Sequence, residues 1–125
     1  MWSDSDLERF DEARELEVSV VHRNGRAGSW TPIWVVRVGD RVLVRSWHRR
    51  TTGWFGHAVA RGRARVRVPG VEADVAVADL GSADPGLRVA TDTAYRDKYG
   101  PHGHGSMVTD EDAGTTLELV RIAAV

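Results

Sequence analysis

The sequence predicts an α+β fold built on a small antiparallel β-barrel. Several runs of apolar residues alternate with polar ones, which is the period of a half-buried strand. Tight turn signals connect neighbouring runs, so we expect about six strands paired mostly as hairpins, with two or three short helices between them. Hairpin-linked strands in a chain of 125 residues close most easily into a barrel, because closure removes exposed strand edges. The length predicts a single domain spanning residues 1–125.

The first predicted element is a short amphipathic helix over residues 4–14. Ser3 or Ser5 can cap it, and its first turn is acidic, as is typical of a helix N-terminus. Residues 16–21 then alternate with the period of a strand, and the glycine-containing segment 23–29 has the composition of a loop.

The most distinctive element is a hairpin. Two β-rich runs, Ile33–Val38 and Arg41–Trp47, flank Gly39-Asp40, a dipeptide typical of a two-residue turn. The remaining predicted elements are a short helix over 53–60, strands over 62–68 and 71–78, a helix over 84–99 and a strand over 115–122.

Two of these elements carry further detail. Asp84 and Pro85 are suited to the cap and first position of the helix over 84–99. In the hairpin of 62–68 and 71–78, we expect Glu72 and Asp74 to face Arg67 and Arg65 across the two strands.

Composition excludes several classes of protein. Apolar residues make up 42% and charged residues 28%, which is typical of a soluble globular chain rather than a disordered one. No apolar run approaches the roughly 20 residues that span a bilayer, and the acidic N-terminus does not resemble a secretory signal. The absence of cysteine excludes disulfides, thiolate metal sites and cysteine nucleophiles. We therefore expect a cytoplasmic protein with no membrane partner.

The net charge of −1 conceals a strong segregation of charge. Residues 1–17 contain seven acidic and two basic residues, whereas residues 37–67 contain nine arginines and one acidic residue. A basic region of this size favours an anionic ligand. Because nearly all cationic residues of the chain are arginine, the choice of arginine over lysine carries little information by itself.

The densest candidate site is the segment Arg45–Trp54, which runs from a strand end to a helix start. Such a junction binds anions, because unpaired N–H groups and the helix dipole both favour negative charge. Trp47 and Trp54 add flat apolar surface on which an aromatic ring can lie. The combination suits a phosphorylated aromatic cofactor. The alternative interpretation is a solvated basic loop beside two core tryptophans.

Other clusters give weaker signals. The arginines at 61, 63, 65 and 67 suggest a nucleic-acid groove, but no aromatic residue alternates with them, so we do not favour nucleic acid as a partner. His102 and His104, followed by Asp110, Glu111 and Asp112, lack the spacing of a defined metal site, and we predict no bound metal. Tyr95 and Tyr99 share a helix face and are expected to be packing residues.

The order of these elements resembles the split β-barrel flavoproteins, the pyridoxamine-phosphate-oxidase-like proteins and deazaflavin-dependent reductases. The residues that carry this resemblance are Thr31-Pro32-Ile33-Trp34, the Gly-Asp hairpin and Val44-Arg45-Ser46. A bacterial family of unknown function within that group is more similar still. That similarity covers roughly residues 5–122 and rests on four short motifs: 36–40 (VRVGD), 53–55 (GWF), 94–100 (AYRDKYG) and 115–119 (TTLEL).

The resemblance implies a homodimeric split barrel that binds FMN or a deazaflavin at the dimer interface and acts as an oxidoreductase on a small molecule. In such proteins basic and hydroxyl residues hold the cofactor phosphate. The deazaflavin-dependent branch carries a Trp-x-x-Asn motif, which Trp54 matches and in which His57 replaces the asparagine. The cofactor-binding residues implied by position are Arg45, Ser46, Arg49, Thr51, Thr52, Trp54 and His57.

The cofactor itself supplies hydride chemistry, so no acid/base dyad is required and no catalytic residue is assigned. Trp30, Trp34 and the loop His102–Ser106 are candidates for the lining of a substrate pocket. The alternative interpretation is a non-catalytic split barrel that binds another small anionic or aromatic ligand.

Overall fold

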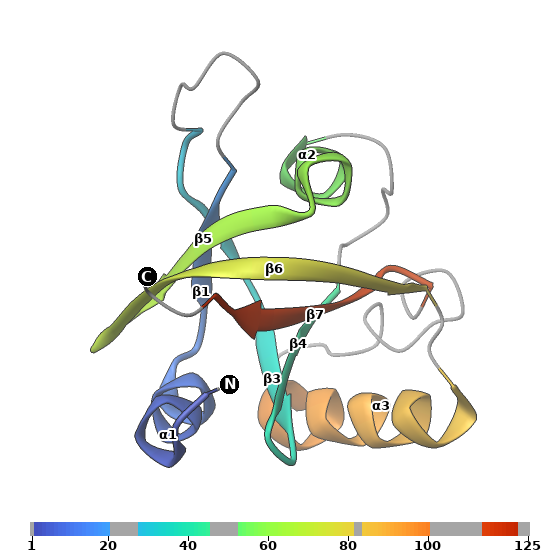
Figure 1. The fold of residues 1–125 in the computed structure, drawn as a ribbon. Helices are drawn as coiled ribbons and strands as arrows, with labels where there is room; N and C mark the ends of the chain where they lie inside the picture. Colours follow the sequence, from blue (N-terminus) through green and yellow to red (C-terminus); the bar gives the residue numbers. More distant parts are fainter. Residues whose placement is uncertain (1, 21–27, 46–52, 82–83, 101–113, 123–125) are drawn as a thin grey trace.

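The computed structural model describes residues 2–20, 28–45, 53–81, 84–100 and 114–122. These residues form three helices and seven strands (Figure 1). In chain order the elements are α1 (Asp4–Glu12), β1 (Leu16–Ser19), β2 (Thr31–Ile33), β3 (Val35–Val38), β4 (Arg41–Val44), α2 (Gly53–Arg61), β5 (Arg63–Val68), β6 (Val71–Gly81), α3 (Pro85–Tyr99) and β7 (Thr116–Arg121).

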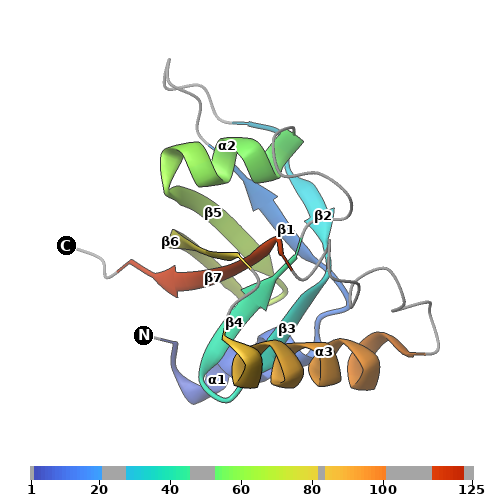
Figure 2. The same ribbon diagram turned by 90° about the vertical axis from the view of Figure 1, so that its right-hand side faces the viewer.

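The strands form one antiparallel sheet in the order β2-β1-β5-β6-β7-β4-β3. Its two outer strands, β2 and β3, are consecutive in the sequence and only Trp34 separates them. Because the chain passes directly from one edge of the sheet to the other, the sheet curves into a nearly closed barrel (Figure 2). The predicted α+β fold on an antiparallel barrel is therefore confirmed, with seven strands in place of about six.

One predicted strand is divided in two. The sequence predicts a single strand over Ile33–Val38, but the chain changes partners at Trp34. Ile33 pairs with Leu16 of β1, whereas Val35 pairs with Val44 of β4. The expectation of one continuous strand is wrong because barrel closure requires a corner at this position.

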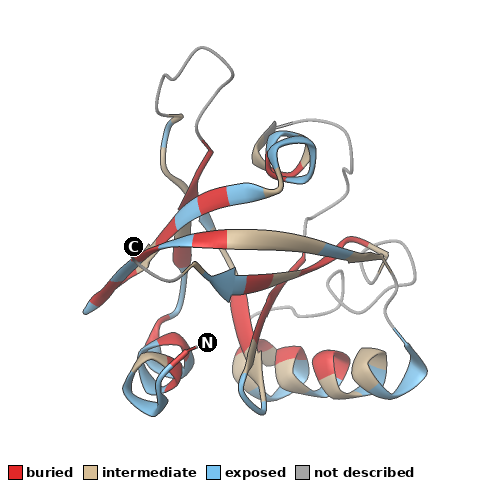
Figure 3. Cartoon of the chain, viewed as in Figure 1, coloured by how far each residue is buried: buried red, intermediate tan, exposed pale blue. Residues whose placement is uncertain are grey.

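Buried residues of β3 and β4 belong to two apolar clusters that lie on opposite faces of these strands. Figure 3 shows buried segments in both strands and in α3. Val42 and Val44 face the barrel interior, which α1 and α2 also enter with residues such as Phe10 and Phe55. Leu43 faces the other way and packs with Tyr95 of α3. Side chains of a strand alternate between its two faces, so a strand covered on both faces is apolar throughout.

The helix caps and the hairpin turn follow the sequence-based prediction. The Ser3 side chain accepts a hydrogen bond from Asp6 N, and the Asp6 side chain accepts one from Ser3 N in return. Asp84 accepts a hydrogen bond from Leu87 N at the start of α3. Gly39 has φ 62°, which fits the tight turn between β3 and β4. None of the described helices combines the length and apolar character needed to cross a membrane.

Candidate functional site

The end of β4 places Arg45 in a buried polar network. The Arg45 side chain leaves the barrel wall toward α3, and the residue is only 1% exposed. Its Nη1 lies 2.6 Å from Asp92 Oδ1, and its Nε donates a hydrogen bond of 2.9 Å to Thr116 Oγ1. The guanidinium carbon also lies 5.4 Å from the ring centroid of Tyr95. Arg45 therefore joins three elements, β4, α3 and β7.

This network fixes the point at which the chain leaves β4. A buried arginine is tolerated when a carboxylate neutralises it and further hydrogen bonds satisfy its donors. Asp92 is also the i+4 neighbour of Arg88, whose Nε lies 3.6 Å from Asp92 Oδ2. The Asp92 carboxylate is thus held between two guanidinium groups, one buried and one at the surface.

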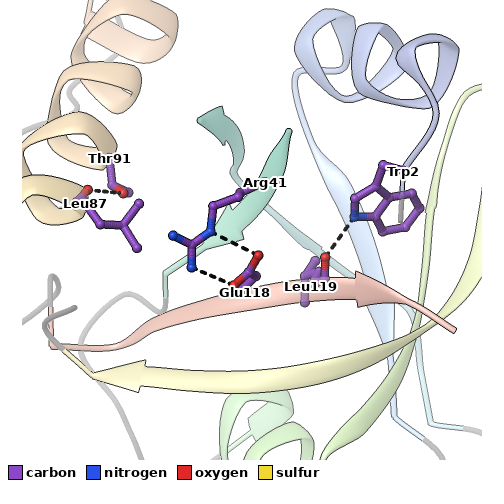
Figure 4. A network of polar contacts seen from close by, with 6 residues as sticks. All are labelled: Trp2, Arg41, Leu87, Thr91, Glu118 and Leu119. Carbon is purple, nitrogen blue, oxygen red and sulfur yellow. Dashed lines mark hydrogen bonds and ion pairs between the residues drawn. The ribbon is translucent and has the colours of Figure 1, made fainter. Parts of the chain in front are cut away.

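Polar contacts at the start of β4 connect it to β7 (Figure 4). Arg41 donates two hydrogen bonds, of 3.1 and 2.7 Å, to the carboxylate of Glu118 and so joins β4 to β7. On the neighbouring residue of β7, the Leu119 carbonyl accepts a hydrogen bond of 2.9 Å from the indole of Trp2. Paired guanidinium–carboxylate contacts of this kind constrain orientation as well as distance. The start of β4, the strand that precedes the candidate segment, is therefore held against β7.

The far end of the candidate segment is the start of α2. Trp54 is half-buried and packs against the barrel core, with its ring 5.6 Å from that of Phe55 in an edge-to-face arrangement. His57 lies one turn further along α2 and is exposed. Part of the Trp54 indole thus remains at the surface beside the start of the helix.

The described residues cover only part of the predicted cofactor site. Arg45, Trp54 and His57 lie within them. Ser46, Arg49, Thr51, Thr52 and the loop His102–Ser106 lie outside the described residues. The phosphate-binding role assigned to this segment therefore stays a prediction.

The two tryptophans suggested as pocket lining lie in different environments. Trp34 stacks on Tyr99 of α3, with centroids 4.2 Å apart and planes 1° apart. Trp30 lies beneath the guanidinium of Arg67, which is 3.9 Å from its ring centroid. Both residues are half-buried. Trp34 lies at the corner between β2 and β3, and its ring packs there on the buried Tyr99.

A second polar cluster surrounds the C-terminal end of α3. The Tyr99 hydroxyl lies 2.7 Å from the Arg14 carbonyl and accepts a hydrogen bond from Val35 N at 3.1 Å. Burial raises the pKa of Tyr99 to about 12. Lys98 donates hydrogen bonds to the carbonyls of Phe10 and Val35, and desolvation lowers its pKa to about 8. The expectation that Tyr99 is a packing residue is confirmed.

The arginines of β5 are mostly paired with carboxylates. Arg65 lies opposite Asp74, and Arg67 lies opposite Glu72, as the sequence predicts. The Arg65 guanidinium binds Glu72 at 2.7 Å and Asp74 at 3.2 Å. Arg67 instead pairs with Glu17 at 3.0 Å, because β1 lies on the other side of β5. The predicted register of Arg67 and Glu72 is thus confirmed, but the prediction that their side chains pair is wrong.

Asp92 and Thr116 are the site residues that sequence reasoning missed. Asp92 shares a helix face with Tyr95 and Tyr99, at spacings of three and seven residues, and all three are buried. A carboxylate on the apolar face of a helix indicates that a cation is buried beside it, but the sequence does not identify that cation. No group of metal-ligating side chains occurs within the described part of the chain.

Comparison with known proteins identifies the family. The family model described as "Uncharacterized protein conserved in bacteria (DUF2255)" matches residues 6–119. The chain belongs to this family. The match confirms the resemblance to a bacterial family of unknown function. No curated protein matches the DUF2255 chain closely enough to count as a relative.

Solved structures share the fold of this DUF2255 chain. HutZ, the heme storage protein from Vibrio cholerae, has a TM-score of 0.66 at 11% identity, with 99% of this chain and 93% of HutZ covered. An FAD-binding protein from Mesorhizobium loti has a TM-score of 0.64 at 14% identity, with 98% and 91% covered. An F420 reductase has a TM-score of 0.52 at 13% identity, with 94% and 92% covered. The expected split-barrel fold is confirmed.

Proposed function

We propose that the protein binds a flavin or deazaflavin nucleotide through the segment Arg45–Trp54 and acts as a small-molecule oxidoreductase. The observation that carries this proposal is the junction between β4 and α2. A buried ion pair holds one end of the segment at Arg45, and a half-exposed indole lies at the other end at Trp54. A phosphate and an aromatic ring are the two groups that such a junction suits.

The residues of the segment fit a cofactor phosphate. Ser46, Arg49, Thr51 and Thr52 supply hydroxyl and guanidinium donors within a short stretch. Arg45 donates hydrogen bonds from Nε to Thr116 and from Nη1 to Asp92. We therefore propose that Arg45 fixes the position of the start of the segment. When bound, a flavin-type ring supplies hydride transfer, and the protein orients it and limits access of water.

The fold comparisons support a ligand of this chemistry. The similar structures include an FAD-binding protein and an F420 reductase. At these identities the likeness establishes the fold alone. The step from fold to cofactor is our proposal, and it rests on the donors of the segment together with Trp54.

We propose further that two copies of the chain form the cofactor site. The outer face of β6 and β7 carries small apolar residues, since Ala76 pairs with Val120 across the two strands. Val120 is 40% exposed. Ala76 and Val120 therefore form a small apolar pair on this face, and partly exposed apolar side chains favour burial against a second copy.

The first experiment is an absorption titration of the purified protein with FMN, FAD and a deazaflavin nucleotide. We expect saturable binding at micromolar concentration for one of the three. Arg49→Gln should weaken that binding about tenfold or more, as the loss of a charge-assisted hydrogen bond does. Arg96→Gln, an exposed change on α3, is the matched control and should leave it unchanged. Absence of saturable binding to all three would overturn the proposal.

The dimer is tested separately by light scattering. Val120→Lys should convert a dimer to a monomer, because a charge in the centre of an apolar interface is poorly solvated. Val89→Lys, at a residue of α3 that is 64% exposed, should leave the dimer intact. If the wild-type protein is a monomer and still binds a flavin, the proposal that two copies form the cofactor site is wrong.

A further inference from the structure

A surface groove of about 400 Å³ lies beside the end of α2, where the chain turns into β5 next to β6. Its lining residues are Arg61, Arg63, Ala64, Arg65 and Asp74. The volume is in the range of small-molecule sites. The groove involves neither Arg45 nor the start of α2, so the proposed flavin site does not account for it.

The arginines along this face differ in whether a carboxylate neutralises them. Arg65 is bound by Glu72 and Asp74, and Arg67 is bound by Glu17. Within the described part of the chain, neither Arg61 nor Arg63 makes a side-chain hydrogen bond or an ion pair. Both residues are exposed and border the groove. The uncompensated positive charge is therefore confined to the end of the groove next to α2.

The turn between α2 and β5 holds these two arginines in place. Gly62 separates them and has φ 68°, a left-handed conformation that glycine adopts without strain. Gly62 N donates a hydrogen bond of 2.8 Å to Ala58 O, and Gly62 O accepts one of 2.9 Å from Val77 N. The backbone between Arg61 and Arg63 is thus tied to both α2 and β6. A fixed backbone lowers the entropic cost of bringing two guanidinium groups to one ligand.

We propose that this groove binds a small phosphorylated molecule through Arg61 and Arg63. Two arginines that line the same groove match the charge of about −2 on a phosphate monoester, and the planar guanidinium donates two parallel hydrogen bonds to phosphate oxygens. Asp74, held by Arg65, also lines the groove and provides an acceptor for a hydroxyl or amino group of the same molecule. The ligand class is therefore a phosphate ester with a polar donor.

The charge pattern favours a small ligand over a nucleic-acid strand. A strand of nucleic acid needs a continuous basic track, usually with aromatic residues on which bases stack. Here the track ends after Arg63, because Glu72, Asp74 and Glu17 neutralise the next two arginines. Among the described residues that line the groove, none is aromatic.

The test is an NMR titration of the full-length ¹⁵N-labelled protein with inorganic phosphate, pyrophosphate and malonate at constant ionic strength. We expect saturable shifts at the Nε–Hε groups of Arg61 and Arg63 and at the Gly62 amide, with pyrophosphate bound more tightly than malonate. Arg63→Gln should weaken pyrophosphate binding about tenfold or more. Arg96→Gln, another exposed arginine, should leave it unchanged.

Three outcomes would overturn the inference. Shifts of equal size at Arg96 would show that the anions bind without selectivity. Equal affinity for malonate and pyrophosphate would show that the site does not recognise phosphate. Binding of a single-stranded oligonucleotide of about 20 nucleotides across Arg61–Arg67, without saturable binding of the small phosphates, would assign the face to nucleic acid. Failure of flavin binding in the absorption titration leaves this test unaffected.

Discussion

Arg45 Nη1 and Asp92 Oδ1 lie 2.6 Å apart between the end of β4 and the middle of α3, and the arginine side chain has no exposed surface. The two residues are 47 positions apart in the sequence. Their ion pair connects the strand that leads into the proposed cofactor segment with the helix that covers the outer face of β3 and β4.

Asp92→Asn should strongly destabilise the fold. The variant leaves the Arg45 guanidinium buried without an anionic partner, which costs about 3 kcal/mol or more in other buried pairs. Glu72→Gln is the matched control, because its partner Arg65 is exposed and surface pairs contribute about 1 kcal/mol or less. Urea denaturation of the two variants measures the difference in unfolding free energy. Equal losses in both would contradict the structural role of the buried pair.

Lys98 should make stability rise with pH in the mildly alkaline range. Its pKa is lowered from 10.5 to about 8 by burial, so the unfolded chain binds more protons between these values. The cost of burying the ammonium is complete below about pH 8 and disappears as pH rises toward 10.5. Because the Lys98 side chain is only partly buried, we expect the free energy of unfolding to rise by at most about 2 kcal/mol over this range. Unfolding free energies of the wild type and Lys98→Met should diverge across this range, and parallel profiles would rule the effect out.

Tyr99 should make stability fall as pH rises above about 10. Its pKa is raised from 10.0 to about 12, so the phenol ionises first in the unfolded chain. The stability from this group is complete below about pH 10 and is lost as pH rises toward 12, by about 2–3 kcal/mol. Tyr99→Phe removes this loss, and at neutral pH it costs about 1–3 kcal/mol through the contacts with Arg14 and Val35. The absorbance of tyrosinate during the titration checks in which state the phenol ionises, and ionisation of Tyr99 at pH 10 in the folded protein would contradict the prediction.

Gly62→Ala should destabilise the protein by about 1 kcal/mol. No atom lies within 4 Å of the added Cβ, so the cost comes from the left-handed backbone at φ 68° alone. Gly86→Ala provides the contrast, because Gly86 lies in the first turn of α3 without a positive φ and alanine favours a helix. Thermal melts should move in opposite directions for the two variants. The same Gly62→Ala protein should bind pyrophosphate more weakly if the turn positions Arg61 and Arg63.

The local elements could be predicted because they depend on residues close in sequence. The Ser3 cap, the Gly39-Asp40 turn and the helix beginning at Asp84 each follow from a short run of residues. The hairpin of β5 and β6 has the predicted register, since Pro69-Gly70 sets which residues lie opposite one another. These features account for the correct prediction of an α+β barrel.

The candidate site could be predicted only in outline. The sequence indicated Arg45 as an important cation, but it did not indicate that Asp92 and Thr116 would bind it. Likewise the hairpin predicts Glu72 opposite Arg67, yet the side chain pairs with Glu17 from a strand 50 positions away. Arg67 has a carboxylate on each neighbouring strand, Glu17 on β1 and Glu72 on β6. Which of the two it binds depends on the order of the strands in the sheet.

The sequence by itself determined most of the helices and strands, the charge segregation and the basic, hydroxyl-rich composition of residues 45–54. Only the tertiary structure decided that the chain turns a corner at Trp34, where the indole stacks on Tyr99 and Ile33 and Val35 pair with different strands. It also decided which arginines are neutralised and which remain available beside the groove. Local propensities act over a few residues, whereas barrel closure and ion pairing depend on strands brought together from distant parts of the chain.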